Sequence, residues 1–364
     1  MVQEEMRKIF LSLIAAAAMI FTACDAGRGP AEVLFSYKAI LNEEFRFGSG
    51  KEIPVTIESS VDRDGLLSPD GKYLVYSSDR QDGNFDLYLR QIGDISLVRL
   101  TQHPSADISP ALSPDGRTLA FVSMRDDPEG DIFVAGFDPG DAADAAAGGS
   151  NDYRLKANNL TRMTDDSGRV RAVSDLNPSW SPDGKTIVFS SKRGGIHDIW
   201  AMDPDGKNSR RITRDGGMYP SFSPDGKHIA CISYRHGREG ELCVLEISSG
   251  RDEIIKAPGI IKLFPVFAGS AEEIVYTAIE GDTDRSGGID LKDSAALWYC
   301  NIRTGKNYRL TLPSASSFAA RWYPAYATER YRGVLLYSSQ AGTNINISLI
   351  PETGIIPIKD SARS

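Results

Sequence analysis

Short β-rich runs of hydrophobic residues recur along most of this chain, and tight-turn sequences separate them. The stretch 178–191, PSWSPDGKTIVFSS, contains a short strand, a turn and a second strand rich in β-branched residues. A third run, HDIWAMD at 197–203, and a fourth, SRRIT at 209–213, follow it. Strands of this length joined by closely spaced turns predict an all-β protein.

The turn sequence Ser-Pro-Asp-Gly is the most regular feature of the chain. Proline presets φ at the second turn position, and glycine accepts the left-handed conformation at the fourth, so the tetrapeptide predicts a tight hairpin turn. Neighbouring copies are separated by 45, 68 and 42 residues, which is a period near 42–45 interrupted once. This period is typical of a propeller or another repeat array. The four copies begin at Ser68, Ser113, Ser181 and Ser223.

Two further stretches, 264–277 and 323–339, keep the spacing of the strands but have lost the turn motif. The repeats therefore predict a six-bladed β-propeller with four antiparallel strands per blade, and a seventh blade is the alternative. The alignment rests on the residue that opens each first strand, namely Gly65, Pro110, Pro178, Pro220, Pro265 and Pro324.

The closure of the ring has two competing interpretations. Residues 53–57 resemble a fourth strand without a blade of its own and would complete the last blade, which removes an exposed sheet edge. However, 354–360 also reads as the fourth strand of that blade. One of the two segments must then lie elsewhere, for example with 31–48 in a partial seventh blade.

The Ser-Pro-Asp-Gly blades resemble the TolB-like propeller repeats, and the resemblance covers residues 53–360. It implies a scaffold that binds protein partners in the bacterial cell envelope, with peptidoglycan-associated lipoproteins among the candidates. TolB carries an additional N-terminal α/β domain, and the segment between Cys24 and the first repeat is too short for one. The chain therefore resembles a relative of TolB.

The N-terminus predicts export. Arg7 and Lys8 precede an apolar run at 9–23, which is typical of a secretory signal and short for a membrane span. The sequence FTAC resembles the lipobox of bacterial lipoproteins, with Phe21 where leucine is usual, so Cys24 is the expected lipidation site; ordinary cleavage that leaves a free Cys24 is the alternative. We expect a lipoprotein signal peptide at 1–23, a tether at 24–52, the propeller at 53–360 and a tail at 361–364. The predicted location is the cell envelope, lipid-anchored and either periplasmic or surface-exposed.

The composition and net charge of the chain limit the classes of partner that it can bind. Hydrophobic residues make up 41% of the chain, enough for a folded core, and the formal net charge is −8. Nucleic-acid binding needs a basic footprint to neutralise phosphates, so the charge argues against it. We expect a monomer attached to the membrane through its lipid.

The stretch 281–293, GDTDRSGGIDLKD, has the spacing of a calcium loop. Oxygen ligands at positions 1, 3, 5, 7, 9 and 12, with glycine at 6, are the pattern of the EF-hand loop. Position 12 is aspartate here, which resembles the dockerin version of the loop, and the flanks read as strands. We expect a calcium ion that rigidifies a hairpin of the fifth blade, against the alternative of a solvated acidic loop. The expected ligands are Asp282, Asp284, Ser286, Gly288, Asp290 and Asp293.

Four arginines each follow a turn serine by twelve residues, namely Arg80, Arg125, Arg193 and Arg235. The favoured interpretation is a repeated salt bridge across the following hairpin to Asp86, Asp131, Asp198 and Glu241. The alternative is a basic ring that faces an anionic ligand at the central channel.

Cys231 and Cys243 align with aromatic core positions of the other blades, roughly opposite one another across one hairpin. They would form either a disulfide in an oxidising envelope or two buried thiols.

The favoured function is a non-enzymatic protein-interaction scaffold with a structural calcium loop, although the sequence does not decide the question. One alternative is a propeller hydrolase, either a lactonase or a glycan-active enzyme, with its site at the channel mouth; another is a purely structural surface lipoprotein. The expected channel positions are mostly apolar, which favours the scaffold. These positions are Leu67, Leu112, Trp180, Phe222, Phe267 and Tyr326.

Overall fold

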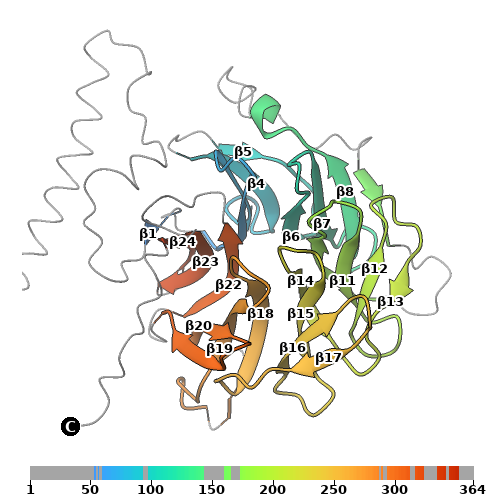
Figure 1. The fold of residues 1–364 in the computed structure, drawn as a ribbon. Coiled ribbons are helices and arrows are strands. Elements are labelled where there is room, and N and C mark those ends of the chain that lie inside the picture. The colour runs from blue at the N-terminus through green and yellow to red at the C-terminus, as the bar shows by residue number, and fades with distance from the viewer. Residues whose placement is uncertain are drawn as a thin grey trace, which may run out of the picture. The chain divides into compact units, whose positions relative to one another are not determined.

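The computed structural model describes residues 53–54, 56, 60–92, 97–142, 160–164, 173–286, 288–289, 293–311, 316–323, 334–341 and 344–351. The chain divides into two compact units, 1–45 and 46–364, and all of the described residues belong to the second. Their strands form six four-stranded sheets, in which neighbouring strands run antiparallel (Figure 1). The predicted all-β propeller with four-stranded antiparallel blades is confirmed.

Five blades follow the chain in simple order from the inner strand to the outer strand. The first has β2 (Asp62–Leu67), β3 (Tyr73–Ser78), β4 (Asp86–Gln91) and β5 (Leu97–Arg99); the second has β6 (Asp107–Leu112), β7 (Thr118–Ser123), β8 (Asp131–Gly136) and β9 (Leu160–Arg162). The third has β10 (Asp175–Trp180), β11 (Ile187–Ser191), β12 (Asp198–Met202) and β13 (Arg210–Arg211). The fourth has β14 (Met218–Phe222), β15 (His228–Ser233), β16 (Glu241–Glu246) and β17 (Asp252–Ile254); the fifth has β18 (Ile261–Phe267), β19 (Glu273–Ile279), β20 (Ala295–Asn301) and β21 (Lys306–Arg309).

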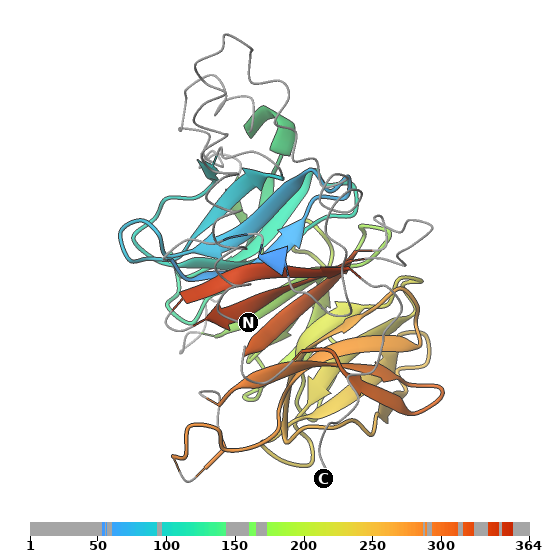
Figure 2. The same ribbon diagram turned by 90° about the vertical axis from the view of Figure 1, so that its left-hand side faces the viewer.

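The last blade is assembled from both ends of the propeller. It contains β22 (Ser317–Tyr323), β23 (Val334–Ala341) and β24 (Asn344–Pro351), and its outer strand is β1 (Ile53–Pro54). Ile53 lies opposite Leu349 in an antiparallel pair, and Figure 2 shows the blue β1 beside the red last blade. Of the two expected closures, the structure therefore has the N-terminal one, made by Ile53 and Pro54. The competing segment 354–360, like 31–48, lies outside the described residues.

The register of the inner strands differs from the expected one. Pro110 and Pro178 sit in the middle of β6 and β10, not at their starts. In the last blade the expected opening residue, Pro324, follows the end of β22, and Ala320 takes the equivalent place in the strand. The alignment failed there because alanine replaces the strand proline at this step, and the next proline in the sequence lies four residues later.

The hydrophobic core lies between neighbouring blades. One cluster joins Leu89 of the first blade to Phe121 of the second, and another joins Phe189 of the third to Ile132 of the second. Equivalent clusters join the third to the fourth, the fourth to the fifth and the fifth to the last blade, and β2 contacts β22, β23 and β24 to complete the ring. Each sheet thus buries both faces, which explains the continuous hydrophobic runs of the second strands.

The four Ser-Pro-Asp-Gly turns have one geometry. In the third blade, the Ser181 hydroxyl donates to Asp183 at 2.6 Å and accepts from the backbone N–H of Thr186 at 2.9 Å. Neighbouring turns also touch, because a Cβ added at Gly116, where φ is +73°, would lie 3.0 Å from Cδ of Pro69. Glycine is therefore required at this position by both conformation and space.

The turn hydroxyl gives a first test of this geometry. Ser181→Ala removes two hydrogen bonds from a residue that is nearly buried, so we expect a loss of about 1–2 kcal/mol in the free energy of unfolding. Urea unfolding measures the change. Ser249→Ala, which removes a hydroxyl bonded to Glu246 on an exposed turn, should stay within about 0.5 kcal/mol. Equal losses for the two variants would show that the hydrogen bonds of the Ser-Pro-Asp-Gly turn stabilise the fold no more than those of an exposed turn.

Candidate functional site

Among the described residues, the inner strands enclose a pocket at the centre of the propeller. It is lined at the same step of each inner strand by Asp64, Ser109, Asn177, Tyr219, Phe264 and Ala319, together with Pro178, Pro220, Pro265, Ala320 and Arg321. Every inner strand of the described propeller thus contributes to one site. The fold brings together residues that are more than 250 positions apart in sequence.

A repeated backbone irregularity creates this lining. Each inner strand has a β-bulge at this step, for example between Ile108 and Ala111 in β6. The residue within each bulge has a positive φ, from 49° at Phe264 to 58° at Tyr219. The left-handed conformation costs a non-glycine residue about 1–2 kcal/mol, so the surrounding sheets must hold it in place. The bulge exposes at the channel a residue that a regular strand would turn into a blade interface.

The pocket is polar on one side and apolar on the other. Asp64, Ser109 and Asn177 come from the first three blades, whereas Tyr219 and Phe264 come from the fourth and fifth. The two aromatic rings lie 4.4 Å apart between centroids and are tilted by 57°. Burial raises the pKa of the Tyr219 hydroxyl, so it stays neutral over the physiological range.

In the first five blades the expected channel residues were wrong by three positions. Leu67 is buried, and Leu112, Trp180, Phe222 and Phe267 pack in or against the clusters between blades; Tyr326 lies outside the described residues. A regular strand alternates its side chains with a period of two, and the bulge shifts that period. A polar or aromatic residue directly before the strand proline, as in Asn177–Pro178, was the available signal.

The aligned arginines do not form an unpaired basic ring. Arg80, Arg125 and Arg193 each pair with an aspartate that begins the inner strand of the same blade: Asp62, Asp107 and Asp175. Their side chains are only 13%, 16% and 10% exposed, and the aspartates are fully buried. The guanidinium of Arg193 also lies 5.5 Å from the ring centroids of both Phe189 and Trp200. Arg235 pairs with Asp252 of β17.

The expected salt bridges across the hairpins therefore had the wrong partners. Asp86, Asp131 and Asp198 pair with arginines of the fourth strand, Arg99, Arg162 and Arg211. Glu241 contacts His236 at 2.5 Å. The inner-strand aspartates lie 18 residues before their arginines and so precede the hairpin that follows each arginine.

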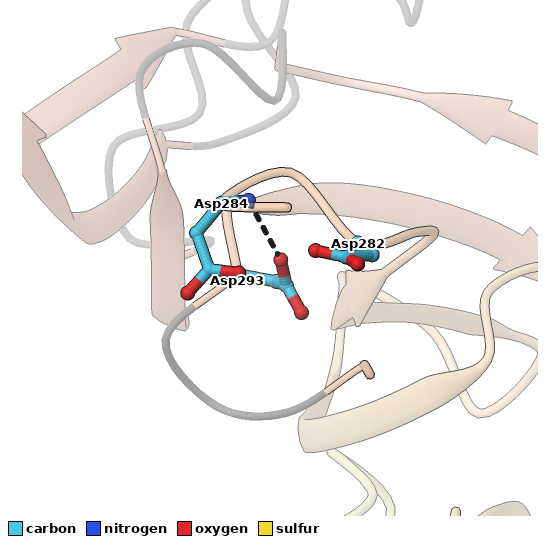
Figure 3. Close-up of side chains that lie close together, drawn as sticks. All are labelled: Asp282, Asp284 and Asp293. Atoms are coloured by element: carbon cyan, nitrogen blue, oxygen red, sulfur yellow. Dashed lines mark hydrogen bonds between the residues drawn. The ribbon is translucent and has the colours of Figure 1, made fainter. Parts of the chain in front are cut away.

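The acidic loop connects β19 and β20 in the fifth blade, as expected. Carboxylate oxygens of Asp282, Asp284 and Asp293 all lie within 4.8 Å of one another (Figure 3). Asp293 is buried although the other two are exposed. Among the described residues this is the one group of three or more acidic, histidine or cysteine side chains close enough to share a metal ion. Ser286 and Gly288 lie in the same loop, and Asp290 is outside the described residues.

The loop backbone turns its N–H groups toward these carboxylates. Oδ1 of Asp293 accepts from the backbone N–H groups of Thr283 at 2.5 Å and Asp284 at 3.2 Å, and the second of these bonds is dashed in Figure 3. The N–H of Ser286 is shared between Asp282 at 3.1 Å and Asp284 at 2.9 Å. These bonds gather the negative charge of the loop on one side, where a cation would reduce the repulsion.

Cys231 and Cys243 lie directly opposite one another on β15 and β16, and both are free, buried thiols. Of the two expected states, the structure therefore has the unbonded one. Directly opposed residues of paired strands fit disulfide geometry poorly. The hydrogen bond with Cys243, together with burial, raises the pKa of the Cys231 thiol, which keeps it protonated.

Cys24, the signal segment and the tether lie outside the described residues. Within the part of the chain that the structure does describe, no helix has the length and apolar character needed to cross a membrane.

Together, the fold and the central pocket define the described part of the chain as a β-propeller whose antiparallel blades surround a pocket lined by all six inner strands. Residues 148–297 match the PD40 family, described as the TolB beta propeller domain. This match supports the resemblance expected from the Ser-Pro-Asp-Gly repeats.

Solved structures with similar folds include two of the TolB type and one enzyme. TolB from Acinetobacter baumannii is 21% identical with a TM-score of 0.52, over 70% of this chain and 55% of that chain. A candidate TolB from Agrobacterium tumefaciens is 20% identical with a TM-score of 0.55, over 72% and 90%. An oligogalacturonate lyase from Vibrio parahaemolyticus is 14% identical with a TM-score of 0.51, over 84% and 94%. This chain thus spans 55% of the length of the Acinetobacter TolB, and identities this low show the fold alone.

The buried ion pairs give a second test. Arg193→Gln leaves the fully buried Asp175 carboxylate without its guanidinium partner, so we expect a loss of about 3 kcal/mol in the free energy of unfolding. Arg303→Gln is the matched control, because Arg303 is 73% exposed and pairs with Glu272 at the surface. Urea unfolding of both variants measures the two losses in stability. A loss below about 1 kcal/mol in the free energy of unfolding of Arg193→Gln would show that the ion pair does not stabilise the fold.

Proposed function

We propose that this protein is a lipid-anchored β-propeller of the bacterial cell envelope that serves as a protein-interaction scaffold. The observation that carries the proposal is the central pocket, which presents two aromatic rings, three prolines and a guanidinium at the axis of the propeller. Tyrosine and arginine are enriched among the residues that contribute most to protein–protein binding. The TolB match over 148–297 supports the same class of function.

The anchor and the location rest on the N-terminal sequence. Arg7, Lys8 and the apolar run before Cys24 support export and lipidation of the cysteine, with the propeller held at the membrane by the tether. Envelope proteins, with peptidoglycan-associated lipoproteins as first candidates, are the proposed partners. A single acyl chain binds membranes weakly, so stable anchoring needs more than one chain on Cys24 or its amine.

The alternative, a propeller hydrolase at the channel mouth, has less support. It is favoured by the similar fold of a lyase and by the Asp64 carboxylate in the pocket. Glycoside hydrolysis uses a pair of carboxyl groups about 5–10 Å apart, and among the described pocket residues Asp64 supplies one. The third hypothesis is a purely structural surface lipoprotein. Under that hypothesis, no partner binds at the pocket.

Crosslinking in the native envelope tests the scaffold. We expect wild-type protein to give a defined protein adduct, and Tyr219→Asn with Phe264→Asn to lose most of it, because both rings line the pocket. Asparagine suits these positions since Asn177 has the same left-handed conformation in the third blade. Ile247→Asn, at an exposed outer turn, is the control and should keep the adduct. Mass spectrometry identifies the partner.

No adduct from wild-type protein, or hydrolysis of a small substrate by the pure protein, would contradict the scaffold. The same preparation tests the anchor, because Cys24→Ser should move the protein from the membrane fraction to the soluble fraction.

We further propose that the loop at 281–293 binds calcium as a structural ion. Support comes from the EF-hand spacing and from the convergence of the Asp282, Asp284 and Asp293 carboxylates. Calcium prefers six to eight hard oxygen ligands, and the loop offers carboxylate, hydroxyl and carbonyl oxygens. Its place between β19 and β20 implies that the ion stiffens this hairpin, with no part in chemistry at the central pocket.

Calorimetric titration tests the ion directly. We expect calcium binding by the wild-type protein and a stabilisation of about 2.7 kcal/mol at a free calcium concentration of 100 times Kd. Asp284→Asn should weaken binding at least tenfold, whereas Asp205→Asn, at the exposed turn between β12 and β13, should not change it. Unchanged stability on addition of calcium or a chelator would identify a solvated acidic loop.

A further inference from the structure

Arg321 breaks the repeat at the central pocket. It lies two residues after the left-handed residue of β22 and opposite Leu336 on β23. The equivalent residues of the other inner strands are small or apolar and hold the same register, as Ala111 does opposite Ala120. The full set of equivalents is Leu66, Ala111, Ser179, Ser221 and Val266.

The guanidinium of Arg321 differs from the other half-buried guanidinium groups of the blades. Arg80, Arg125 and Arg193 are each paired with a buried aspartate. Arg321 is also partly buried, yet among the described residues it has neither an ion-pair nor a hydrogen-bond partner. Guanidinium donors without a protein partner are available to a ligand, and their planar arrangement matches a carboxylate bidentately.

The other charged residue of the pocket does not neutralise it. The Asp64 carboxylate lies 3.8 Å from Nε of Arg63, and the Arg63 guanidinium is stacked 4.0 Å from the centroid of Phe85. Arg63, Asp64 and Arg321 together leave one positive charge at this side of the pocket. Ser109 and Asn177 continue the polar side and offer hydrogen bonds to a second oxygen.

The opposite side of the pocket selects an apolar group. Tyr219 and Phe264 form the tilted aromatic pair, and Pro220 and Pro265 follow them in the lining. Aromatic and proline surfaces bury apolar groups at little loss of side-chain entropy. A ligand that satisfies both sides carries an anion and an apolar group next to each other.

We propose that the central pocket binds a carboxylate that a partner protein presents beside an apolar group, at its chain end or on an acidic side chain, and that Arg321 pairs with that carboxylate. This inference rests on the proposed scaffold function and names the chemistry of the partner. Arg321 selects the anion, and the Tyr219–Phe264 side selects what is attached to it.

Phenylacetate and phenylacetamide provide matched probes, because they share the ring and differ in charge. In ligand-observed NMR titrations of the purified full chain at fixed ionic strength, we expect phenylacetate to bind at least tenfold more tightly. Arg321→Gln should remove that difference while phenylacetamide binding stays unchanged. Arg303→Gln, which removes the same charge at an exposed turn, should behave as wild type. Thermal melting of each variant confirms that it is folded.

Three results would overturn the inference: equal binding of the two probes by wild-type protein, an unchanged preference in folded Arg321→Gln, or tighter binding of glucuronate than of phenylacetate. The last would indicate an acidic sugar as the ligand. The envelope crosslinking experiment separates this inference from the function beneath it. A protein adduct that forms equally with wild type and Arg321→Gln would support the scaffold function but contradict the proposed carboxylate contact of Arg321.

Discussion

Burial of each sheet between two neighbours is the constraint on which the rest of this structure depends. Among the described residues, the hydrophobic clusters each take residues from two adjacent blades, so in this part of the chain the core is shared between blades. The first and last blades meet the same requirement only because β2 contacts the last blade and β1 completes it. Two residues of ladder, Ile53–Pro54, thereby link the start of the propeller to its end. Closure removes the exposed edge that an open array would leave at β24.

Closure also makes the pocket. Six bulged inner strands converge on one axis, and each bulge points one left-handed residue toward it. The bulged backbone is the same in each inner strand, but the residue within the bulge differs from blade to blade. The pocket therefore has a polar side and an aromatic side without any change of backbone. This separation between a repeated framework and variable lining residues lets one fold serve many ligands.

Charge is distributed in the same manner. The repeated aspartates and arginines are buried in pairs within blades, where they fix the inner strand to the second hairpin. Outside these repeated pairs, Arg321 lines the pocket, and the aspartates of the loop between β19 and β20 lie close to one another. These two groups belong to different parts of the blade architecture, the inner strand and an outer hairpin loop, and they carry opposite charges.

The sequence by itself determined the class of fold, the four strands per blade and the place of the acidic loop, because these follow from local patterns. Ser181-Pro182-Asp183-Gly184 specifies its own turn, and the residues at 281–293 specify their own curvature. The sequence did not reveal the channel lining, since a bulge before Pro178 shifts the period of the strand and leaves no signature in hydrophobicity. It also did not reveal the partners of Arg193 or the isolation of Arg321, because both depend on which distant side chains the closed ring brings within reach. Only the tertiary structure could decide between 53–57 and 354–360 as the closing strand, since both segments have strand character and one edge of β24 is open to pairing.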